Sequence, residues 1–356
     1  MSLRRMQVTD YRCLRSADLE LDRRFTLISG PNASGKTSLL EAIYVLGRGR
    51  SFRTRQLNHL IRTGAERFVV FGEVELAERI VPLGVEGSNG GVRARAGGAP
   101  VGSLAELAVA LPAQIIDPEI HRLIEEGPSQ RRRFLDWGVF HVEHSFVKSW
   151  QAYQQVLRQR NAALRLRQPR AVVSAWDGEL LRLAAMIDAA RSRYVLDLES
   201  AARSIADRLL RMELALTYRS GWSREMSFAD ALERSWPHDY EVGSTSVGPQ
   251  RAELTIRLDG LAVKDRISRG QQKLLAASLL IAQIKLFPSN GDVRPTLLLD
   301  DPSAELDDDR LARLIEEVSR ETVQLIVTSL DPELMAFGVP GRRYRIADGI
   351  VTPSDI

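Results

Sequence analysis

The segment from Gly30 to Thr37 constrains the fold more than any other part of the sequence. It fits the phosphate-binding pattern G-x-x-x-x-G-K-[ST] at every fixed position. The apolar run Phe25–Ile28 before it is typical of a buried strand, and apolar residues at helical spacing follow it from 38 to 46. Strand, glycine-rich loop and helix form the context in which this pattern binds a phosphate, and a chance glycine-rich turn is the alternative. We therefore expect a nucleotide site with a loop of Gly30, Pro31, Asn32, Ala33, Ser34 and Gly35.

Four side chains that follow two of the expected strands would complete this site with ATP and Mg²⁺. Lys36 would pair with the β- and γ-phosphates, and the Thr37 hydroxyl would bind Mg²⁺. The apolar strand 296–299 leads into Asp300 and Asp301, and phosphate-loop folds hold their metal at this end of a strand. Asp300 would hold Mg²⁺, and Asp301 would orient or deprotonate the attacking water, so Lys36 and Asp301 are the predicted catalytic residues. The alternative is an Asp-Asp-Pro turn that only ends a strand.

A further anion site is expected at the turn formed by Ser268, Arg269, Gly270 and Gln271, because a serine there opens a helix. Within its own subunit this turn has no phosphate left to bind. We therefore predict that it meets the γ-phosphate held by a second copy of the chain, so that ATP favours a homodimer. An ordinary serine helix cap is the alternative.

The chain changes from a strand-like to a helical pattern between about residues 105 and 212. Apolar residues recur every three or four positions from Trp176 to Leu209, and an earlier stripe runs from Phe146 to Leu164. A proline-containing turn at 168–169 separates the stripes, which indicates an antiparallel helical hairpin. Strands return near 252–258, 296–299 and 323–327. We expect an α/β P-loop ATPase head made of residues 1–105 and 242–356, interrupted by an inserted helical domain over 106–241.

Composition narrows the class of protein further. The 356 residues are 44% hydrophobic and 27% charged, which is ordinary for a globular protein. No apolar run approaches membrane-spanning length and no signal peptide is evident, so we expect a cytoplasmic protein without a membrane partner. The single cysteine, Cys13, excludes a disulfide framework and a cysteine-based zinc site.

A basic stretch after the first helix is the candidate contact with DNA. Residues 1–60 carry eleven Lys or Arg against five Asp or Glu, although the net charge of the whole chain is only +3. Arginines alternate with other residues at Arg48, Arg50, Arg53 and Arg55, and would share one face if the segment were extended. Such a row would bind phosphates without reading bases and with a steep salt dependence. The alternatives are that this loop packs on the nucleotide domain or contacts ATP.

Residues 131–133, three consecutive arginines, are a second candidate for DNA contact. Apolar neighbours at 134, 135 and 137 place them on an expected amphipathic helix of the insertion. Solvated or salt-bridged arginines are the alternative there.

Together these motifs resemble the ABC-type ATPase head shared with SMC proteins, and more closely the bacterial RecF recombination mediators. Supporting runs are Gly49–Thr54, Gly127–Asp136 and Gly248–Arg251. The resemblance implies an ATP-dependent DNA-binding protein of recombinational repair that acts at single-strand gaps, duplex junctions and stalled forks. It implies ATP-driven dimerisation, slow and DNA-stimulated hydrolysis, and RecR- and RecO-type partners that help to load recombinase. It further implies that Arg12 senses a phosphate and that a loop with Ser303, Glu305 and Asp307 faces the partner subunit.

The sequence departs from the transporter type of this head at three positions. Asp301 stands where those heads have glutamate, Arg269 where a second glycine is common, and Ser329 where many have histidine. The shorter carboxylate fits weak hydrolysis, as in a timer, and Thr328 and Ser329 receive no assigned role. A kinase or GTPase has no use for the serine turn, and a nuclease needs a further acidic metal cluster. An ABC-type ATPase that acts through a protein partner, without binding DNA itself, remains the alternative.

Overall fold

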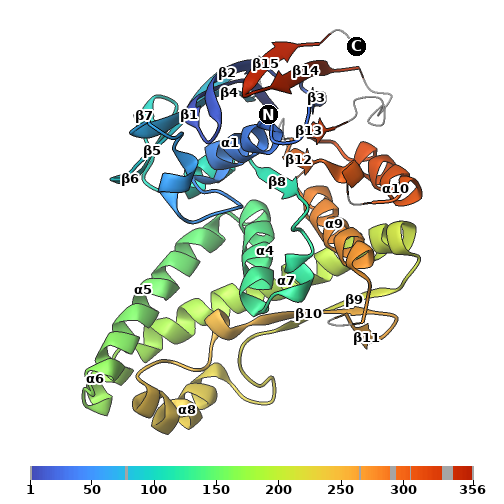
Figure 1. Cartoon of the computed structure of the whole chain (residues 1–356). Coiled ribbons are helices and arrows are strands. Elements are labelled where there is room, and N and C mark those ends of the chain that lie inside the picture. The colour runs from blue at the N-terminus through green and yellow to red at the C-terminus, as the bar shows by residue number, and fades with distance from the viewer. Residues whose placement is uncertain are drawn as a thin grey trace. The chain divides into compact units, whose positions relative to one another are not determined.

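The computed structural model describes residues 2–76, 79–263, 266–288, 294–304, 306–330 and 340–354. Contacts divide the chain into two compact units, the first of residues 1–120 and 287–356 and the second of residues 121–286 (Figure 1). These boundaries differ from the division expected at 105/106 and 241/242, because residues 242–286 make their contacts within the second unit. The inserted domain over 106–241 therefore stays a prediction. Within the described residues, no helix has both the length and the apolar character needed to cross a membrane.

A mostly parallel sheet forms one half of the first unit, with the strand order β15-β14-β3-β13-β12-β8. Its three central strands are almost fully buried, as expected where both faces of a sheet are covered. Parallel pairing aligns Asp300 with Thr328 and Ser329 with Ser29, so three strands end at one edge. The strands are β3 (Phe25–Ser29), β8 (Ala113–Ile116), β12 (Thr296–Asp300), β13 (Gln324–Ser329), β14 (Arg342–Ala347) and β15 (Ile350–Pro353).

An antiparallel sheet forms the other half of the first unit, and helix α1 (Lys36–Arg48) packs against both sheets. Leu39 and Ile43 of α1 share one hydrophobic core with Val8, Leu298 and Ile326 of the sheets. The antiparallel strands are β1 (Ser2–Tyr11), β2 (Leu14–Glu20), β4 (Arg67–Leu76), β5 (Arg79–Ser88), β6 (Gly91–Ala96) and β7 (Ala99–Pro100). The short helices η1 (Leu57–Leu60), α2 (Ala105–Ala110) and η3 (Pro302–Ala304) and the longer α10 (Asp308–Ser319) complete the unit.

The second unit is built around one long helix, α7 (Asp177–Leu210), which confirms the apolar stripe expected over this region. Helix α5 (Ser145–Arg165) packs along α7, and the short α6 (Arg170–Ser174) lies between them in the chain, so the expected hairpin is present. Helix α9 (Arg269–Lys285) packs on α7 as well. The remaining elements are α3 (Arg122–Glu125), α4 (Pro128–Val142), α8 (Phe228–Val242), η2 (Pro249–Arg251) and a sheet of β9 (Leu214–Arg219), β10 (Glu253–Leu258) and β11 (Leu261–Ala262).

Candidate nucleotide site

The loop between β3 and α1 has a backbone that only glycine accommodates at two positions. A Cβ on Gly30 would stand 2.2 Å from the carbonyl oxygen of Ile346. Gly35 has φ 112°, in the left-handed region that favours glycine. The loop thus turns tightly off the end of β3 and leads directly into α1, whose first residue is Lys36. This is the strand–loop–helix arrangement that the sequence predicted.

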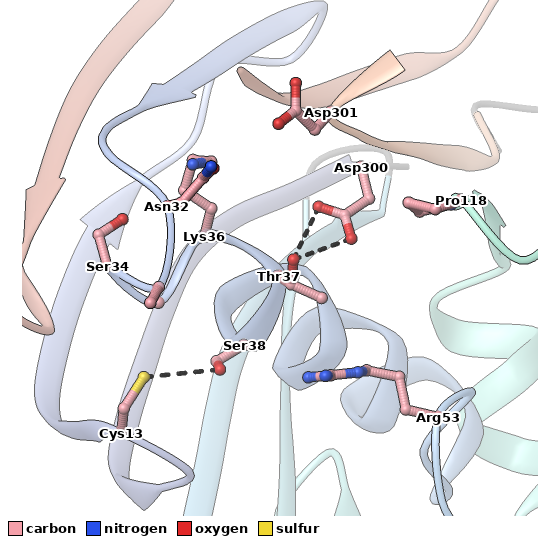
Figure 2. Close-up of a pocket in the computed structure, with 12 residues that line it drawn as sticks. Cys13, Asn32, Ser34, Lys36, Thr37, Ser38, Arg53, Pro118, Asp300 and Asp301 are labelled. Atoms are coloured by element: carbon pink, nitrogen blue, oxygen red, sulfur yellow. Dashed lines mark hydrogen bonds between the residues drawn. The ribbon is translucent and has the colours of Figure 1, made fainter. Parts of the chain in front are cut away.

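A cavity of 310 Å³ opens beside this loop, and it lies entirely within the first unit (Figure 2). Most of the predicted nucleotide residues line it, together with four residues that the sequence did not assign to it, namely Cys13, Ser38, Arg53 and Pro118. The lining consists of Cys13, Asn32, Ala33, Ser34, Gly35, Lys36, Thr37, Ser38, Arg53, Pro118, Asp300 and Asp301. The predicted loop and both predicted carboxylates therefore meet at one hollow.

Lys36 is held at the mouth of the loop by backbone oxygens. Its Nζ donates to the carbonyl oxygens of Gly30, at 2.7 Å, and Pro31, at 3.0 Å. Within the described residues no carboxylate pairs with this nine-tenths buried ammonium group. The Ser34 hydroxyl is also buried and, among the described residues, has no hydrogen-bond partner. A cation without a carboxylate partner and a hydroxyl without a hydrogen-bond partner, both at a helix N-terminus, are the donors that a phosphate requires.

Thr37 and Asp300 form the second part of the site. The Thr37 hydroxyl donates to the Asp300 carboxylate, with distances of 3.0 and 2.9 Å to its two oxygens (Figure 2). Burial raises the pKa of Asp300, while hydrogen bonds from Thr328 and Thr37 oppose that shift and the neighbouring Asp301 reinforces it. A hydroxyl and a carboxylate held together in this way are hard oxygen ligands, which suit Mg²⁺. The residues present thus fit the predicted metal.

Asp301 follows in an unusual backbone conformation, with φ 44°. Its amide donates to the carbonyl and hydroxyl oxygens of Thr328, at 3.2 and 3.1 Å, and its carboxylate accepts a hydrogen bond from Ser303 at 3.0 Å. The Thr328 hydroxyl also donates to Asp300 at 2.9 Å. Thr328 therefore holds the carboxylate of Asp300 and the backbone of Asp301, a role that the sequence left open and that only the parallel register of β12 and β13 reveals. Ser329 is buried, and its carbonyl oxygen accepts from the Gly30 amide.

Arg12 lies near this site but is paired with Glu41 of α1, a residue that the sequence analysis did not single out. Two guanidinium nitrogens of Arg12 donate to the two Glu41 oxygens, each at 2.8 Å, and the Glu41 side chain is fully buried. Glu41 also accepts from the Ser51 hydroxyl, which in turn accepts from the Arg53 amide at 2.9 Å. Glu41 thus connects the phosphate-loop helix to the basic stretch. The phosphate-sensing role of Arg12 remains a prediction.

The basic stretch after α1 is not extended, although its alternating arginines had suggested that it would be. Residues 49–56 make bends instead of a strand and Arg48 belongs to α1, so the extended segment expected to align the four arginines is absent. Arg48 ends α1 and donates to the carbonyl oxygen of Ala113 and the side chain of Gln114, both at 3.2 Å, and burial lowers its pKa to about 10. Arg53 lines the nucleotide cavity, which favours the alternative that this loop contacts ATP. Arg50 and Arg55 are exposed, and their contact with DNA stays a prediction.

The serine turn belongs to the second unit and is already formed there. The Ser268 hydroxyl accepts from the Gln271 amide at 3.3 Å, and the Gln271 side chain accepts from the Ser268 amide at 2.9 Å, which makes a capping box at the start of α9. Gly270 follows Arg269 in the first turn of the helix, and Arg269 lies 3.4 Å from His121 between side-chain nitrogens. In the other predicted dimer segment, Asp307 caps α10 by accepting from the Arg310 amide, and Glu305 lies outside the described residues.

Comparison with known proteins agrees with this arrangement. A family profile described as the RecF/RecN/SMC N-terminal domain matches residues 2–346. Proteins named DNA replication and repair protein RecF from Yersinia pseudotuberculosis serotype O:1b and Yersinia enterocolitica serotype O:8 are 39% and 40% identical over 354 residues, or 98% of each chain.

Solved structures of the same group are similar over nearly the whole chain. One, of "the recombination mediator protein RecF-ATP in RecFOR pathway", has a TM-score of 0.89 at 27% identity and covers 99% of this chain and 97% of its own. An SMC head bound to the C-terminal winged helix domain of ScpA has a TM-score of 0.62 at 17% identity, which shows a common fold. This chain therefore belongs to the RecF family, within the wider group of RecF, RecN and SMC N-terminal domains.

Proposed function

We propose that the protein is an ATP-dependent DNA-binding switch of recombinational repair and replication-fork maintenance. In this proposal ATP with Mg²⁺ favours a closed homodimer that clamps DNA, and slow hydrolysis releases both. The relatives that carry the name DNA replication and repair protein RecF support the process, and a similar structure described as RecF-ATP supports the nucleotide. We infer a cytoplasmic protein on the same grounds.

The observation that carries the proposal is the single cavity that gathers Lys36, Thr37, Asp300 and Asp301. Lys36 is held by carbonyl oxygens without a carboxylate, so a phosphate would be the anion that it lacks. Thr37 and Asp300 would hold Mg²⁺, which when bound neutralises charge on the phosphates. Asp301 would accept a proton from, or orient, the attacking water.

We infer weak hydrolysis from the way in which Asp301 is held. One of its oxygens already accepts from Ser303, and its amide is tied to Thr328, so the carboxylate is fixed. The aspartate side chain is also one methylene shorter than the glutamate that transporter-type ATPase heads have at this position. We infer that Asp301 acts as a slow timer, and that DNA accelerates the reaction by favouring the closed dimer.

In the proposed dimer the serine turn of one copy would complete the cavity of the other; the turn and the cavity belong to different compact units of the chain. The capping box presents Ser268 and the first amides of α9, which are donors for an anion at a helix N-terminus. Ser303 and Asp307, with Glu305, would face the second copy. RecR- and RecO-type proteins are the proposed partners, and single-strand gaps and duplex junctions the proposed DNA.

The test is DNA binding by fluorescence anisotropy with ATP, ADP or no nucleotide, combined with molecular mass from light scattering. It compares the wild type with Asp301→Asn, and Asp309→Asn, at an exposed position of α10, is the matched control. We expect tight DNA binding and a doubled mass only with ATP. In Asp301→Asn the DNA-bound dimer should persist, whereas in the wild type and the control it should disappear as ATP is hydrolysed. A normal hydrolysis rate in Asp301→Asn contradicts the role of Asp301. Dimerisation without DNA affinity favours the alternative, an ATPase that acts through a protein partner.

A further inference from the structure

Two buried arginines of the second unit hold one segment, residues 243–252. Arg160 and Arg191 are 1% and 0% exposed and are among the largest fully buried side chains of the described residues. Burying a guanidinium is costly unless it is paired and fully hydrogen-bonded. Both therefore need partners, and both find part of them in this segment.

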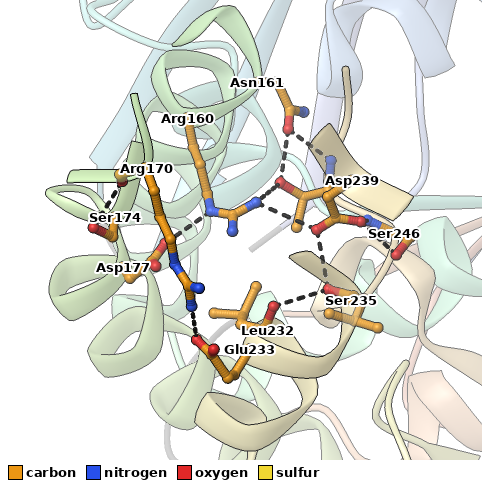
Figure 3. Close-up of polar contacts among 12 residues, drawn as sticks. Arg160, Asn161, Arg170, Ser174, Asp177, Leu232, Glu233, Ser235, Asp239 and Ser246 are labelled. Atoms are coloured by element: carbon orange, nitrogen blue, oxygen red, sulfur yellow. Dashed lines mark hydrogen bonds and ion pairs between the residues drawn. The ribbon is translucent and has the colours of Figure 1, made fainter. Parts of the chain in front are cut away.

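Arg160 of α5 holds the first part of the segment (Figure 3). It donates to Asp177 at 2.8 Å, to the Thr245 hydroxyl at 2.7 Å and to Asp239 at 3.4 Å. Asp239 also accepts from the Ser246 amide at 2.9 Å and hydroxyl at 2.6 Å. Residues 245 and 246 are thus bonded directly to α5 and α8, and Arg160 connects them to Asp177 of α7.

Arg191 of α7 holds the second part. It donates to Asp136 at 2.8 Å and to the carbonyl oxygen of Pro249 at 2.7 Å, and its guanidinium lies 4.8 Å from the centre of the Trp150 ring. Gly248 has φ 122°, and a Cβ there would stand 2.6 Å from the Tyr153 hydroxyl. The turn at 248–251 is therefore fixed in one conformation.

The rigid turn presents an exposed arginine, Arg251, next to a second arginine on α4. Arg132 donates to the carbonyl oxygen of Ala252 at 2.8 Å, so its guanidinium lies against the end of this turn. Burial lowers the pKa of Arg132, and the positive charges of Arg191 and Arg251 lower it further, while the carboxylates of Glu253 and Asp136 raise it. The two arginines thus form a local concentration of positive charge.

The carboxylates nearest to this pair already have other partners. Glu253 accepts two hydrogen bonds from Arg131, at 2.8 and 3.0 Å, and Asp136 is the partner of Arg191. Within the described residues, no carboxylate forms an ion pair with Arg132 or Arg251. Glu253 and Asp136 act on Arg132 only through space, so both guanidinium groups can take a phosphate as a direct partner.

We propose that Arg132 and Arg251 form a contact site for the phosphates of a DNA backbone. The proposal rests on the proposed DNA binding and names a site for it. A planar guanidinium suits phosphate oxygens, and a turn fixed by buried groups positions it at little entropic cost. No aromatic platform or base-reading side chain is needed, so the contact is independent of sequence.

The test measures DNA affinity of the full-length chain, with ATP, as a function of salt. It compares wild type, Arg132→Ala, Arg251→Ala, Arg251→Lys and Arg234→Ala, where Arg234 is an exposed arginine of α8. We expect each alanine variant at the site to lose about tenfold in affinity and to reduce the salt slope by about one. Arg251→Lys should recover part of the affinity, because it keeps the charge. Arg234→Ala should match the wild type, and melting temperatures establish that each variant is folded.

The outcomes distinguish failure of the Arg132–Arg251 site from failure of the proposed DNA-binding function. Wild-type DNA binding with unchanged affinity in both alanine variants overturns the site and leaves the proposed function intact. A wild type that binds no DNA overturns both. Loss of binding to a RecR- or RecO-type protein, with DNA affinity unchanged, overturns the phosphate site in favour of an acidic protein surface. A loss equal to that of Arg234→Ala shows only a general charge effect and also overturns it.

Discussion

Replacing Arg160 by methionine should destabilise the second unit, because it leaves a buried carboxylate without its cation. Asp239 is fully buried, and Arg160 is the basic residue that lies against it, at 3.4 Å. Breaking a buried ion pair in this way costs about 3–5 kcal/mol. Ser235 and Ser246 would still donate three hydrogen bonds to Asp239. We therefore expect the lower end, about 3 kcal/mol.

Asp177, the second carboxylate that pairs with Arg160, allows a comparison of the two losses of stability. The Asp177 side chain is 27% exposed, so Asp177→Asn removes a charge that water already screens in part. Ion pairs of this kind contribute about 1 kcal/mol or less. Arg160→Met should thus cost clearly more than Asp177→Asn, although each removes one member of the same 2.8 Å pair.

Tryptophan fluorescence measures the unfolding of the second unit without a contribution from the first. All five tryptophans, Trp137, Trp150, Trp176, Trp222 and Trp236, lie within residues 121–286. With a urea slope of about 2–3 kcal/mol/M, a loss of about 3 kcal/mol lowers the unfolding midpoint by about 1 M. Binding of a fluorescent ATP analogue checks the first unit in the same samples. Equal midpoints for Arg160→Met and Asp177→Asn would refute the reasoning.

Three further outcomes concern the nucleotide cavity. Lys36→Ala should weaken ATP binding by roughly 100-fold in a titration with a fluorescent analogue, since a charge-assisted contact is lost, whereas Lys148→Ala in the other unit should not. Thr328→Val should raise the pKa of Asp300 further, because it removes a hydrogen bond to the ionised form. The acid limb of the ATPase pH profile then moves to higher pH, and Thr296→Val should leave it in place. Arg53→Ala should weaken ATP binding more than Arg55→Ala, because only Arg53 lines the cavity.

Local chemistry made the nucleotide cavity predictable from the sequence. The loop at 30–37 carries its own strand and helix context, and Asp300 and Asp301 end a strand whose burial its apolar run already indicates. The apolar periodicity of α7 was sufficient to predict this helix for the same reason, because one apolar stripe extends over many turns. In these cases neighbouring residues alone decide the conformation.

Residues whose role depends on distant partners were not predictable in this way. Glu41 reads as an ordinary charged residue of a helix, yet it is buried because Arg12 and Ser51 reach it from other elements. The Ser51 hydroxyl accepts hydrogen bonds from the backbone amides of Arg53 and Thr54. These bonds bend the basic stretch, which the alternation of its arginines had suggested to be extended. Thr328 acquires its role only through strand register.

The separation of Lys36 and Ser268 into two compact units leads to the last prediction. Each unit orders its own element: carbonyl oxygens hold Lys36, and a capping box holds Ser268. A Lys36→Ala chain should therefore keep an intact serine turn, and a Ser268→Arg chain an intact cavity. If the site completes across a homodimer, neither variant hydrolyses ATP at the normal rate alone, but a mixed dimer contains one complete site.

At an ATP concentration that saturates both variants, half of the dimers in an equal mixture are mixed and each holds one complete site of two, so the ATPase rate should recover to about one quarter of the wild-type value. Mixing the Ser268→Arg chain with a Lys36→Ala/Ser268→Arg double variant should give no recovery, because no intact turn is then present. If the first mixture also stays inactive while both variants still dimerise, the turn does not serve a site on a second copy. Activity would then depend on Lys36 and Ser268 of the same chain, and dimerisation would need another role.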